Sequence, residues 1–174
     1  MLSFSSYVRK YDSFYIKLRQ INRICFPVSY NDSFYKEIVK KKDENLCKFA
    51  YVNGFVIGAI CARIETNPDS DNNNSKKQSN RIYIMTLAVL AAYRSRGAGT
   101  KLVESILEYY ESNKDDTSHE MYNVNEITLH VQTSNQDAIK FYVEKFGFVQ
   151  GELVPNYYRR IDPPDCYVLS KKLT

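Results

Sequence analysis

The heptapeptide Arg94-Ser95-Arg96-Gly97-Ala98-Gly99-Thr100 joins two segments of different periodicity. Before it, the run from Arg81 to Leu90 is nearly all apolar, which is typical of a central strand covered on both faces. After it, the run from Thr100 to Tyr110 places apolar residues at helical spacing. Glycines at such a junction let the backbone approach a ligand, and the first N–H groups of the new helix are unpaired and partly positive. Together with the two arginines they can hold a pyrophosphate, although an ordinary loop explains the heptapeptide equally well.

The glycine spacing distinguishes this stretch from two common phosphate-binding motifs. A dinucleotide fingerprint has three glycines in G-x-G-x-x-G and an acidic residue about 20 positions later. A P-loop ends in Gly-Lys-Ser or Gly-Lys-Thr. The stretch matches neither pattern, so the two common nucleotide-binding classes are not indicated.

The rest of the chain alternates helix-like and strand-like segments, which predicts an α/β fold with helices over a mixed sheet. Asn53-Gly54 between two apolar runs predicts a tight hairpin. Residues 13–26 show helical spacing, and Pro27 ends this predicted helix. The other predicted helices run from Asn31 or Asp32 to Val39, from Thr100 to Tyr110, and from a cap at Ser134 or Asn135 to Gly147. The predicted strands are Phe4–Val8, Leu46–Val52, Phe55–Glu65, Arg81–Leu90, Glu126–Gln132, Phe148–Tyr157 and Cys166–Leu173.

The length of 174 residues predicts a single domain, 1–174. Residues 66–80 have no apolar side chain beyond Pro68, so nothing there offsets the entropy of ordering. Residues 111–125 form a second polar segment. Both segments are expected to be mobile loops within the domain.

The composition narrows the class of protein. Hydrophobic residues make up 44% and charged residues 25%, as in an ordinary soluble protein. The net charge of +4 fits an acidic ligand, a face near ribosomal RNA, or an ordinary surface. The four cysteines form no C-x-x-C pair, so no metal site is expected. Since neither a secretory segment nor a membrane-spanning run is found, we expect a reducing, intracellular compartment.

The pattern Arg-x-x-Gly-x-Gly after a strand resembles the acetyl-CoA pyrophosphate loop of the GNAT acetyltransferases. Six further segments resemble one subfamily in the same order, the catalytic subunit of the N-terminal acetyltransferase NatE, also called San. They are Phe26-Pro27-Val28-Ser29-Tyr30-Asn31-Asp32, Tyr83-Ile84-Met85-Thr86-Leu87, Leu129-His130-Val131-Gln132, Phe141-Tyr142, Phe146-Gly147-Phe148 and Asn156-Tyr157-Tyr158-Arg159-Arg160-Ile161. The resemblance implies a GNAT fold: a mixed, mostly antiparallel, seven-stranded twisted sheet flanked by about four helices.

The same resemblance implies acetyl-CoA as the cosubstrate, with no metal. The backbone from Met85 to Val89 is expected to bind the acetyl and pantetheine arm. Tyr142 is a candidate acid for the leaving thiolate, and a packed helix tyrosine beside Phe141 is the alternative. The implied cofactor-binding residues are Leu87, Ala88, Val89, Arg94, Ser95, Arg96, Gly97, Ala98, Gly99, Thr100, Asn135 and Tyr142.

Acetyl transfer to an amine needs a base, and the chain has two histidines. His119 lies in a polar segment and is expected to be exposed, whereas His130 lies in an apolar strand. A strand histidine is by default a hydrogen-bonded core residue, yet an ordinary pKa of about 6.5 also suits a base. The resemblance implies that Tyr83 and His130, on adjacent strands, take the proton of the substrate amine through ordered water. A cysteine nucleophile, Cys61 or Cys166, is the alternative mechanism.

Two aromatic segments could be core or could form the peptide site. The resemblance implies the second reading, in which they hold a first-residue methionine in an apolar pocket and bind the peptide backbone through tyrosine hydroxyls. The implied substrate-binding residues are Phe26, Pro27, Val28, Tyr30, Met85, Tyr157, Tyr158, Arg159, Arg160 and Ile161.

These expectations describe a protein N-terminal acetyltransferase that prefers Met followed by a non-acidic residue and reacts by direct attack in a ternary complex. An internal lysine acetyltransferase and a non-catalytic acetyl-CoA-binding subunit of a ribosome-associated complex remain as alternatives. The expected partners are protein or nascent-peptide N-termini and the auxiliary and catalytic subunits of a NatA complex at the ribosome, without nucleic-acid or membrane contact. The expected location is the cytoplasm, with the nucleus as a second compartment.

Overall fold

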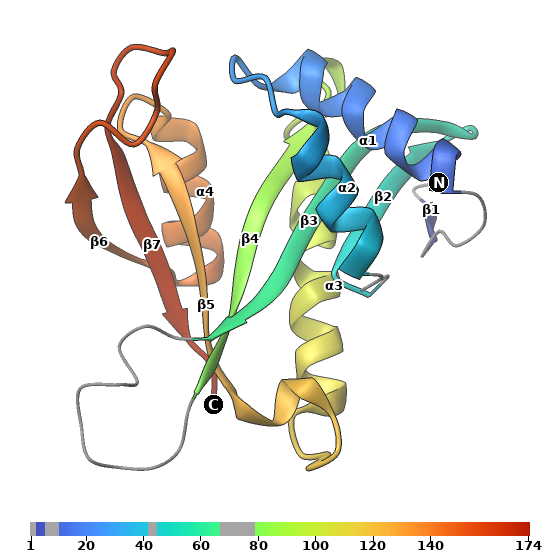
Figure 1. The fold of residues 1–174 in the computed structure, drawn as a ribbon, viewed down its shortest axis with the longest axis vertical. Helices are drawn as coiled ribbons and strands as arrows, with labels where there is room; N and C mark the ends of the chain where they lie inside the picture. Colours follow the sequence, from blue (N-terminus) through green and yellow to red (C-terminus); the bar gives the residue numbers. More distant parts are fainter. Residues whose placement is uncertain (1–2, 6–10, 42–44, 67–78) are drawn as a thin grey trace. The chain divides into compact units, whose positions relative to one another are not determined.

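The computed structural model describes residues 3–5, 11–41, 45–66 and 79–174 (Figure 1). Within these ranges the α-helices are α1 (Tyr11–Cys25), α2 (Asp32–Lys41), α3 (Ala98–Asn113) and α4 (Gln136–Phe146). The strands are β1 (Ser3–Ser5), β2 (Cys47–Val52), β3 (Phe55–Thr66), β4 (Asn80–Val89), β5 (Val124–Gln132), β6 (Val149–Val154) and β7 (Cys166–Lys172). Two short 3₁₀ helices, η2 (Ala91–Tyr93) and η3 (Glu120–Asn123), precede α3 and β5. Among the described helices, none combines the length and the apolar content needed to cross a bilayer.

The described strands form one seven-stranded sheet in the order β1-β2-β3-β4-β5-β7-β6. The pairs β1–β2, β2–β3, β5–β7 and β6–β7 are antiparallel, whereas β4 and β5 run parallel. A mixed, mostly antiparallel sheet with helices α1 to α4 confirms the predicted fold class.

The chain divides into two compact units, and β3 and β4 contribute one end to each. The first unit comprises Met1–Arg63 and Met85–Ser112, and the second comprises Ile64–Ile84 and Asn113–Thr174. The single domain expected over 1–174 stays a prediction.

In the first unit, α1 and α2 cover one face of β2 and β3. Asn31 caps α2, because its Oδ1 accepts the N–H of Phe34 at 3.0 Å. Strand side chains alternate between faces, so Lys48 points away from α1 and α2 and donates to the carbonyl of Ser105 on α3 at 3.0 Å. The buried cluster between α1, α2 and the strands is Leu18, Ile21, Tyr35, Ile38, Cys47, Phe49, Ala59, Cys61 and Ala88.

In the second unit, α4 packs its apolar stripe of Ile139, Tyr142 and Phe146 inward. Asn135 caps this helix by accepting the N–H of Ala138 at 3.2 Å, and Gly147 ends it in the left-handed conformation with φ 69°. Both helix ends were predicted, since an Asx cap and a left-handed glycine satisfy the free backbone groups at helix termini.

Strand β4 differs from its prediction. It buries Ile82, Ile84, Thr86 and Ala88, but the side chains between them are only half-buried. The expectation that both faces are covered is therefore wrong for the face of Tyr83, Met85, Leu87 and Val89. An apolar run does not reveal by itself whether protein covers each face.

Two further local expectations changed. Helix α3 begins at Ala98, before the predicted Thr100, because the carbonyl of Gly97 already accepts the N–H of Lys101 at 3.0 Å. His119 is half-buried rather than exposed, and its Nδ1 accepts the N–H of the fully buried Met121 at 3.1 Å. The segment 111–125 thus contains a packed 3₁₀ turn, while its mobility stays a prediction. Most of the other polar segment, 66–80, lies outside the described residues.

Candidate active site

Tyr83 and His130 lie on the neighbouring parallel strands β4 and β5 of the second unit. The register of the two strands runs from Asn80 opposite Val124 to Tyr83 opposite Thr128. His130 follows Thr128 by two residues, so its side chain is on the same face of the sheet as Thr128 and Tyr83. The fold therefore brings together two residues that are 47 positions apart in the sequence.

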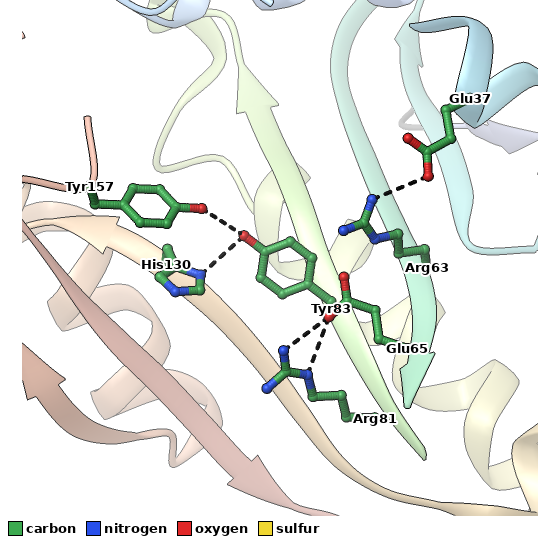
Figure 2. Close-up of polar contacts among 7 residues, drawn as sticks. All are labelled: Glu37, Arg63, Glu65, Arg81, Tyr83, His130 and Tyr157. Carbon is green, nitrogen blue, oxygen red and sulfur yellow. Dashed lines mark hydrogen bonds and ion pairs between the residues drawn. The ribbon is translucent and has the colours of Figure 1, made fainter. Parts of the chain in front are cut away.

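Tyr83, His130 and Tyr157 form a compact polar cluster (Figure 2). The hydroxyl oxygen of Tyr83 is 3.1 Å from Nδ1 of His130 and 3.3 Å from the hydroxyl oxygen of Tyr157. The rings of His130 and Tyr157 are stacked, with centroids 4.5 Å apart and planes 9° apart. Tyr157 was expected only as a substrate-binding residue of the peptide site. The structure places it in contact with both members of the predicted catalytic pair.

An ion pair between Arg81 and Glu65 lies beside this cluster (Figure 2). Nη2 of Arg81 is 3.0 Å from Oε2 of Glu65, and Nε is 3.3 Å from the same oxygen. Their side chains are 22% and 21% exposed, so solvent screens the pair only in part. The sequence analysis missed this pair, although opposite charges at the end of one predicted strand and the start of the next were a usable signal.

The surroundings hold His130 and Tyr83 in their neutral forms. Burial lowers the pKa of His130 below its ordinary 6.5, the Arg81 cation lowers it further, and the Glu65 carboxylate opposes both. Burial, followed by the neighbouring Tyr157 and Glu65, raises the pKa of the Tyr83 hydroxyl. At neutral pH the imidazole can therefore accept a proton, and Tyr83 is a protonated hydroxyl that can donate one.

The predicted cofactor loop, 94–100, belongs to the first unit and presents mainly backbone. Gly97 has φ 84°, and a Cβ built on it would meet no other described atom within 4 Å. Ser95 is also left-handed, with φ 57°, a conformation that costs a residue with a side chain about 1–2 kcal/mol. Because the first α3 bond joins Gly97 and Lys101, the N–H groups of residues 98–100 have no acceptor within the helix. Open space and unpaired donors fit a pyrophosphate.

Arg94 braces this loop. Its Nε donates to the carbonyl of Val89, the last residue of β4, at 3.0 Å. Its charge also opposes the effect of burial, which raises the pKa of the Cys25 thiol at the end of α1. The predicted contact between Arg94 and a pyrophosphate would use its remaining N–H groups. Arg96 lies over the ring of Tyr93, 5.9 Å from the centroid.

The other predicted cofactor residues fall into two kinds. In the first unit, Leu87 and Val89 are half-buried, whereas Ala88 is buried and offers only its backbone. In the second unit, Asn135 uses Oδ1 as the helix cap, which leaves its amide N–H groups for a ligand. Tyr142 is buried, and burial raises the pKa of its hydroxyl, so the hydroxyl keeps its proton at neutral pH. Its role as the acid for the leaving thiolate stays a prediction.

The predicted substrate residues also fall in two places. In the first unit, Phe26, Tyr30 and Met85 pack against the same buried cluster, and the rings of Phe26 and Tyr30 meet edge to face at 6.0 Å. Pro27 is exposed and Val28 is half-buried beside them in the chain. In the second unit, the connection from β6 to β7 carries Tyr157, Tyr158, Arg159, Arg160 and Ile161.

The alternative of a cysteine nucleophile finds no support. The hydrogen bond with Cys47, followed by burial, raises the pKa of Cys61 well above its ordinary value. Burial raises the pKa of Cys166 to about 11. Both thiols are protonated at neutral pH, whereas the thiolate is the nucleophile. Across the described ranges, no three His, Cys, Asp or Glu side chains are grouped to hold a metal ion.

Comparison with known proteins gives concordant matches. The model of the acetyltransferase (GNAT) family matches residues 15–148. The chain is 44% identical over 157 residues to N-alpha-acetyltransferase 50 of Danio rerio, which covers 90% of this chain and 82% of that protein. It is 42% identical over 157 residues to the probable N-acetyltransferase san of Drosophila melanogaster, covering 90% and 74%. The solved structure of Arabidopsis thaliana Naa50 with the bisubstrate analogue CoA-Ac-MVNAL matches with TM-score 0.77, 39% identity and 99% of both chains covered.

Proposed function

Because the chain belongs to the GNAT family of acetyltransferases, we infer that it transfers the acetyl group of acetyl-CoA to the N-terminal amine of proteins. The relatives from fish and fly carry the names of N-acetyltransferases. The analogue bound by the plant relative joins coenzyme A, an acetyl group and the peptide MVNAL. The open, donor-rich loop at 94–100 supports acetyl-CoA as the cosubstrate, and the Tyr83–His130 pair supplies the proton chemistry.

The substrate class follows from the same relative. Its peptide begins with methionine, and the half-buried side chains of Phe26, Val28, Tyr30 and Met85 in this chain are of a kind that suits an apolar first residue. The protein therefore acts on N-termini that begin with Met. The preference for a non-acidic second residue rests on the resemblance alone.

Bound acetyl-CoA supplies an activated acetyl thioester, and the residues of the chain manage the protons. A protein N-terminus has an ordinary pKa of about 7.7–8.0, so much of it is protonated at neutral pH and a base is needed. The Tyr83 oxygen receives the proton of the amine, directly or through water, as the Tyr83 hydroxyl proton moves to Nδ1 of His130. Tyr83 ends neutral and His130 ends as the imidazolium. Tyr142 is the candidate to protonate the leaving thiolate.

The observation that carries the catalytic assignment is the 3.1 Å contact between Tyr83 and Nδ1 of a neutral histidine. A hydroxyl hydrogen-bonded to a base is the arrangement that proton transfer requires. The raised pKa values of Cys61 and Cys166 agree with direct attack in a ternary complex, without a covalent enzyme intermediate.

A peptide assay tests the function. Acetyl-CoA consumption is measured on a peptide that begins Met-Leu and contains one internal lysine, and on a copy with a blocked N-terminus. We expect turnover on the first peptide only. Acetylation of the lysine in the blocked copy would identify a lysine acetyltransferase. Acetyl-CoA binding without turnover of either peptide would identify a non-catalytic binding subunit.

The partner and the location are further proposals that rest on the resemblance. The protein works beside a NatA complex at the ribosome, in the cytoplasm, with the nucleus as a second compartment. Sedimentation of tagged protein with ribosomes, before and after depletion of the NatA auxiliary subunit, tests the partner. Sedimentation that does not depend on that subunit would contradict it, and imaging of the tagged protein in cells tests the location.

A further inference from the structure

Tyr157 contacts both members of the proposed catalytic pair. Its ring lies flat against His130 at 4.5 Å, and its hydroxyl is 3.3 Å from that of Tyr83 (Figure 2). A residue that only bound the peptide would need neither the stacking on His130 nor the contact with Tyr83. At 42% exposure, Tyr157 is the most open of the three side chains, yet it touches the two that are less exposed.

The number of protons that each hydroxyl can donate determines which group donates and which accepts in this cluster. The Tyr83 hydroxyl has one proton to donate, and both Nδ1 of His130 and the Tyr157 hydroxyl lie within 3.3 Å of its oxygen. If Tyr83 donates to Nδ1 of His130, its oxygen is left to accept, and the Tyr157 hydroxyl is a donor placed to satisfy it. Tyr157 then donates its hydroxyl proton to the Tyr83 oxygen, and Tyr83 donates its own to Nδ1 of His130, so both hydrogen bonds run toward the base.

The connection that carries Tyr157 is held in place on both sides of this residue. The N–H of Asn156 donates to Oδ1 of Asp165 at 2.8 Å, and the N–H of Tyr158 donates to the carbonyl of Pro164 at 2.8 Å. The connection is also tied to the end of β5, because Nε2 of Gln132 donates to the carbonyl of Pro163 at 2.8 Å. Strand β5 carries His130, so these bonds fix Tyr157 relative to the imidazole.

We propose that Tyr157 is a positioning residue for acetyl transfer: its ring holds the His130 imidazole in place, and its hydroxyl orients the Tyr83 O–H toward Nδ1. This inference rests on the proposed function and adds a role to the peptide contact that the resemblance implies. It predicts that Tyr157 acts on the rate of transfer as well as on peptide affinity.

The stack also shields the imidazole from water. The groups that face His130 are Tyr83 and Arg81 from β4, Glu65 from β3 and Tyr157 from the β6–β7 connection. Its partner on β7, Val168, carries no charge. Removing the Tyr157 ring leaves the charged groups in place and increases hydration, which favours the charged imidazolium. Removing only the hydroxyl leaves the shield intact.

Two substitutions separate the ring from the hydroxyl. Tyr157→Phe should lower kcat about 2–10-fold, the worth of one hydrogen bond, and should also raise the KM for peptide through the loss of its hydroxyl contact. Tyr157→Ala should lower kcat further and raise the pKa of His130. Tyr122→Phe, on the 3₁₀ helix η3, serves as the matched control and should leave both constants unchanged.

A proton NMR titration reads the histidine without any substrate. The chain has two histidines, so the imidazole C–H signal of His130 is assigned with one His119→Asn variant. We expect the His130 midpoint to rise toward 6.5 in Tyr157→Ala and to stay at the wild-type value in Tyr157→Phe. Circular dichroism checks the folding of each variant.

The outcomes are distinct. An unchanged kcat with a raised peptide KM in Tyr157→Phe would make the residue a peptide contact only and overturn the proposal. An unchanged His130 midpoint in folded Tyr157→Ala would remove the role of the ring. If the alanine variant does not fold, the phenylalanine variant still decides the role of the hydroxyl. A wild-type protein without turnover would instead overturn the proposed function, while the titration would still test the stack.

Discussion

The cofactor loop and the Tyr83–His130–Tyr157 cluster use different parts of the chain, the backbone in the loop and side chains in the cluster. In the loop 94–100, the chemistry comes from backbone N–H groups, and left-handed Ser95 and Gly97 shape their arrangement. In the cluster, it comes from three side chains on β4, β5 and the β6–β7 connection. One region depends on what the main chain can do locally, and the other depends on tertiary register.

This difference predicts different responses to substitution. A backbone site tolerates many side chains but is sensitive to any change in the allowed φ. A side-chain site fails on the loss of a single functional group, while the fold around it persists. Binding of acetyl-CoA and the rate of transfer should therefore be separable by mutation.

The largest effect should come from the side-chain cluster. General acid–base catalysis typically contributes about 10²–10⁴-fold, so Tyr83→Phe and His130→Ala should each lower kcat by at least about tenfold, with little change in acetyl-CoA affinity. Because the two act through one hydrogen bond, the double variant should lose less than the product of the single losses. Steady-state kinetics of folded variants checks this, and wild-type kcat in both would return the residues to core packing.

The backbone site should lose binding when φ is constrained. Gly97→Val should weaken acetyl-CoA at least about tenfold, because a β-branched residue is strained at positive φ and its side chain enters the open space. Gly54→Val is a matched control, since Gly54 has φ 81° and nothing within 4 Å but lies in the β2–β3 turn. Isothermal titration and melting temperatures are compared. Equal affinity losses in both variants would assign the effect to general destabilisation.

Arg94 tests whether the loop also depends on a side chain. Arg94→Ala should weaken acetyl-CoA about 10-fold, through the loss of the brace to Val89 and of a charge-assisted contact. Arg94→Lys keeps the charge but lacks the guanidinium fork, so it should restore binding only in part. Titration of acetyl-CoA into each variant gives the answer. Wild-type acetyl-CoA affinity in the lysine variant would show that only the positive charge of Arg94 matters, and that its guanidinium geometry does not.

The dependence of kcat on pH tests how the charges of Arg81 and Glu65 affect His130. Neutral His130 is the acceptor, so kcat should fall as the pH drops through the pKa of His130, with a midpoint below the ordinary 6.5. Arg81→Gln removes a nearby cation and should move this midpoint to higher pH, whereas Glu65→Gln should move it to lower pH. Rate profiles of the three proteins are compared. Shifts of the same sign would show that the ion pair acts through structure instead.

The smallest effect should come from the polar segment 67–78, whose residues lie outside the described ranges. Loop-closure entropy varies slowly with length, so replacing this segment with a shorter Gly-Ser linker should change the free energy of unfolding by less than about 1 kcal/mol. Urea denaturation measures the difference. A large loss would reveal a structural role that its composition does not indicate.

The fold class could be predicted because local signals agreed. Asn53-Gly54, Pro27, the Asn135 cap and Gly147 each mark the end of an element, and all of them occur where expected. The half-exposed face of β4 could not be predicted, because burial depends on what packs against a strand. The packed turn at Met121 was missed for a similar reason, since one buried side chain is enough to anchor a polar segment.

The site was predictable in unequal parts. Glycine spacing alone pointed to the loop, although nothing marked Ser95 as left-handed. The residues alone gave His130 as a core histidine or a base, and only the resemblance paired it with Tyr83, because strand register is not encoded locally. The stacking of Tyr157 on His130 joins residues from separate elements, so no sequence period reports it.

Asn135 divides its side chain between two tasks, and this limits which residues can replace it. Its carbonyl oxygen caps α4, a task that Asp, Ser or Thr performs about as well. Its amide N–H groups take no part in this cap and can donate to a ligand, whereas an aspartate carboxylate has no N–H group. A carboxylate at this position would leave the helix intact yet repel a phosphate-bearing ligand. The residue chosen at position 135 among functional homologues therefore records whether selection acts on folding alone or on folding and ligand together.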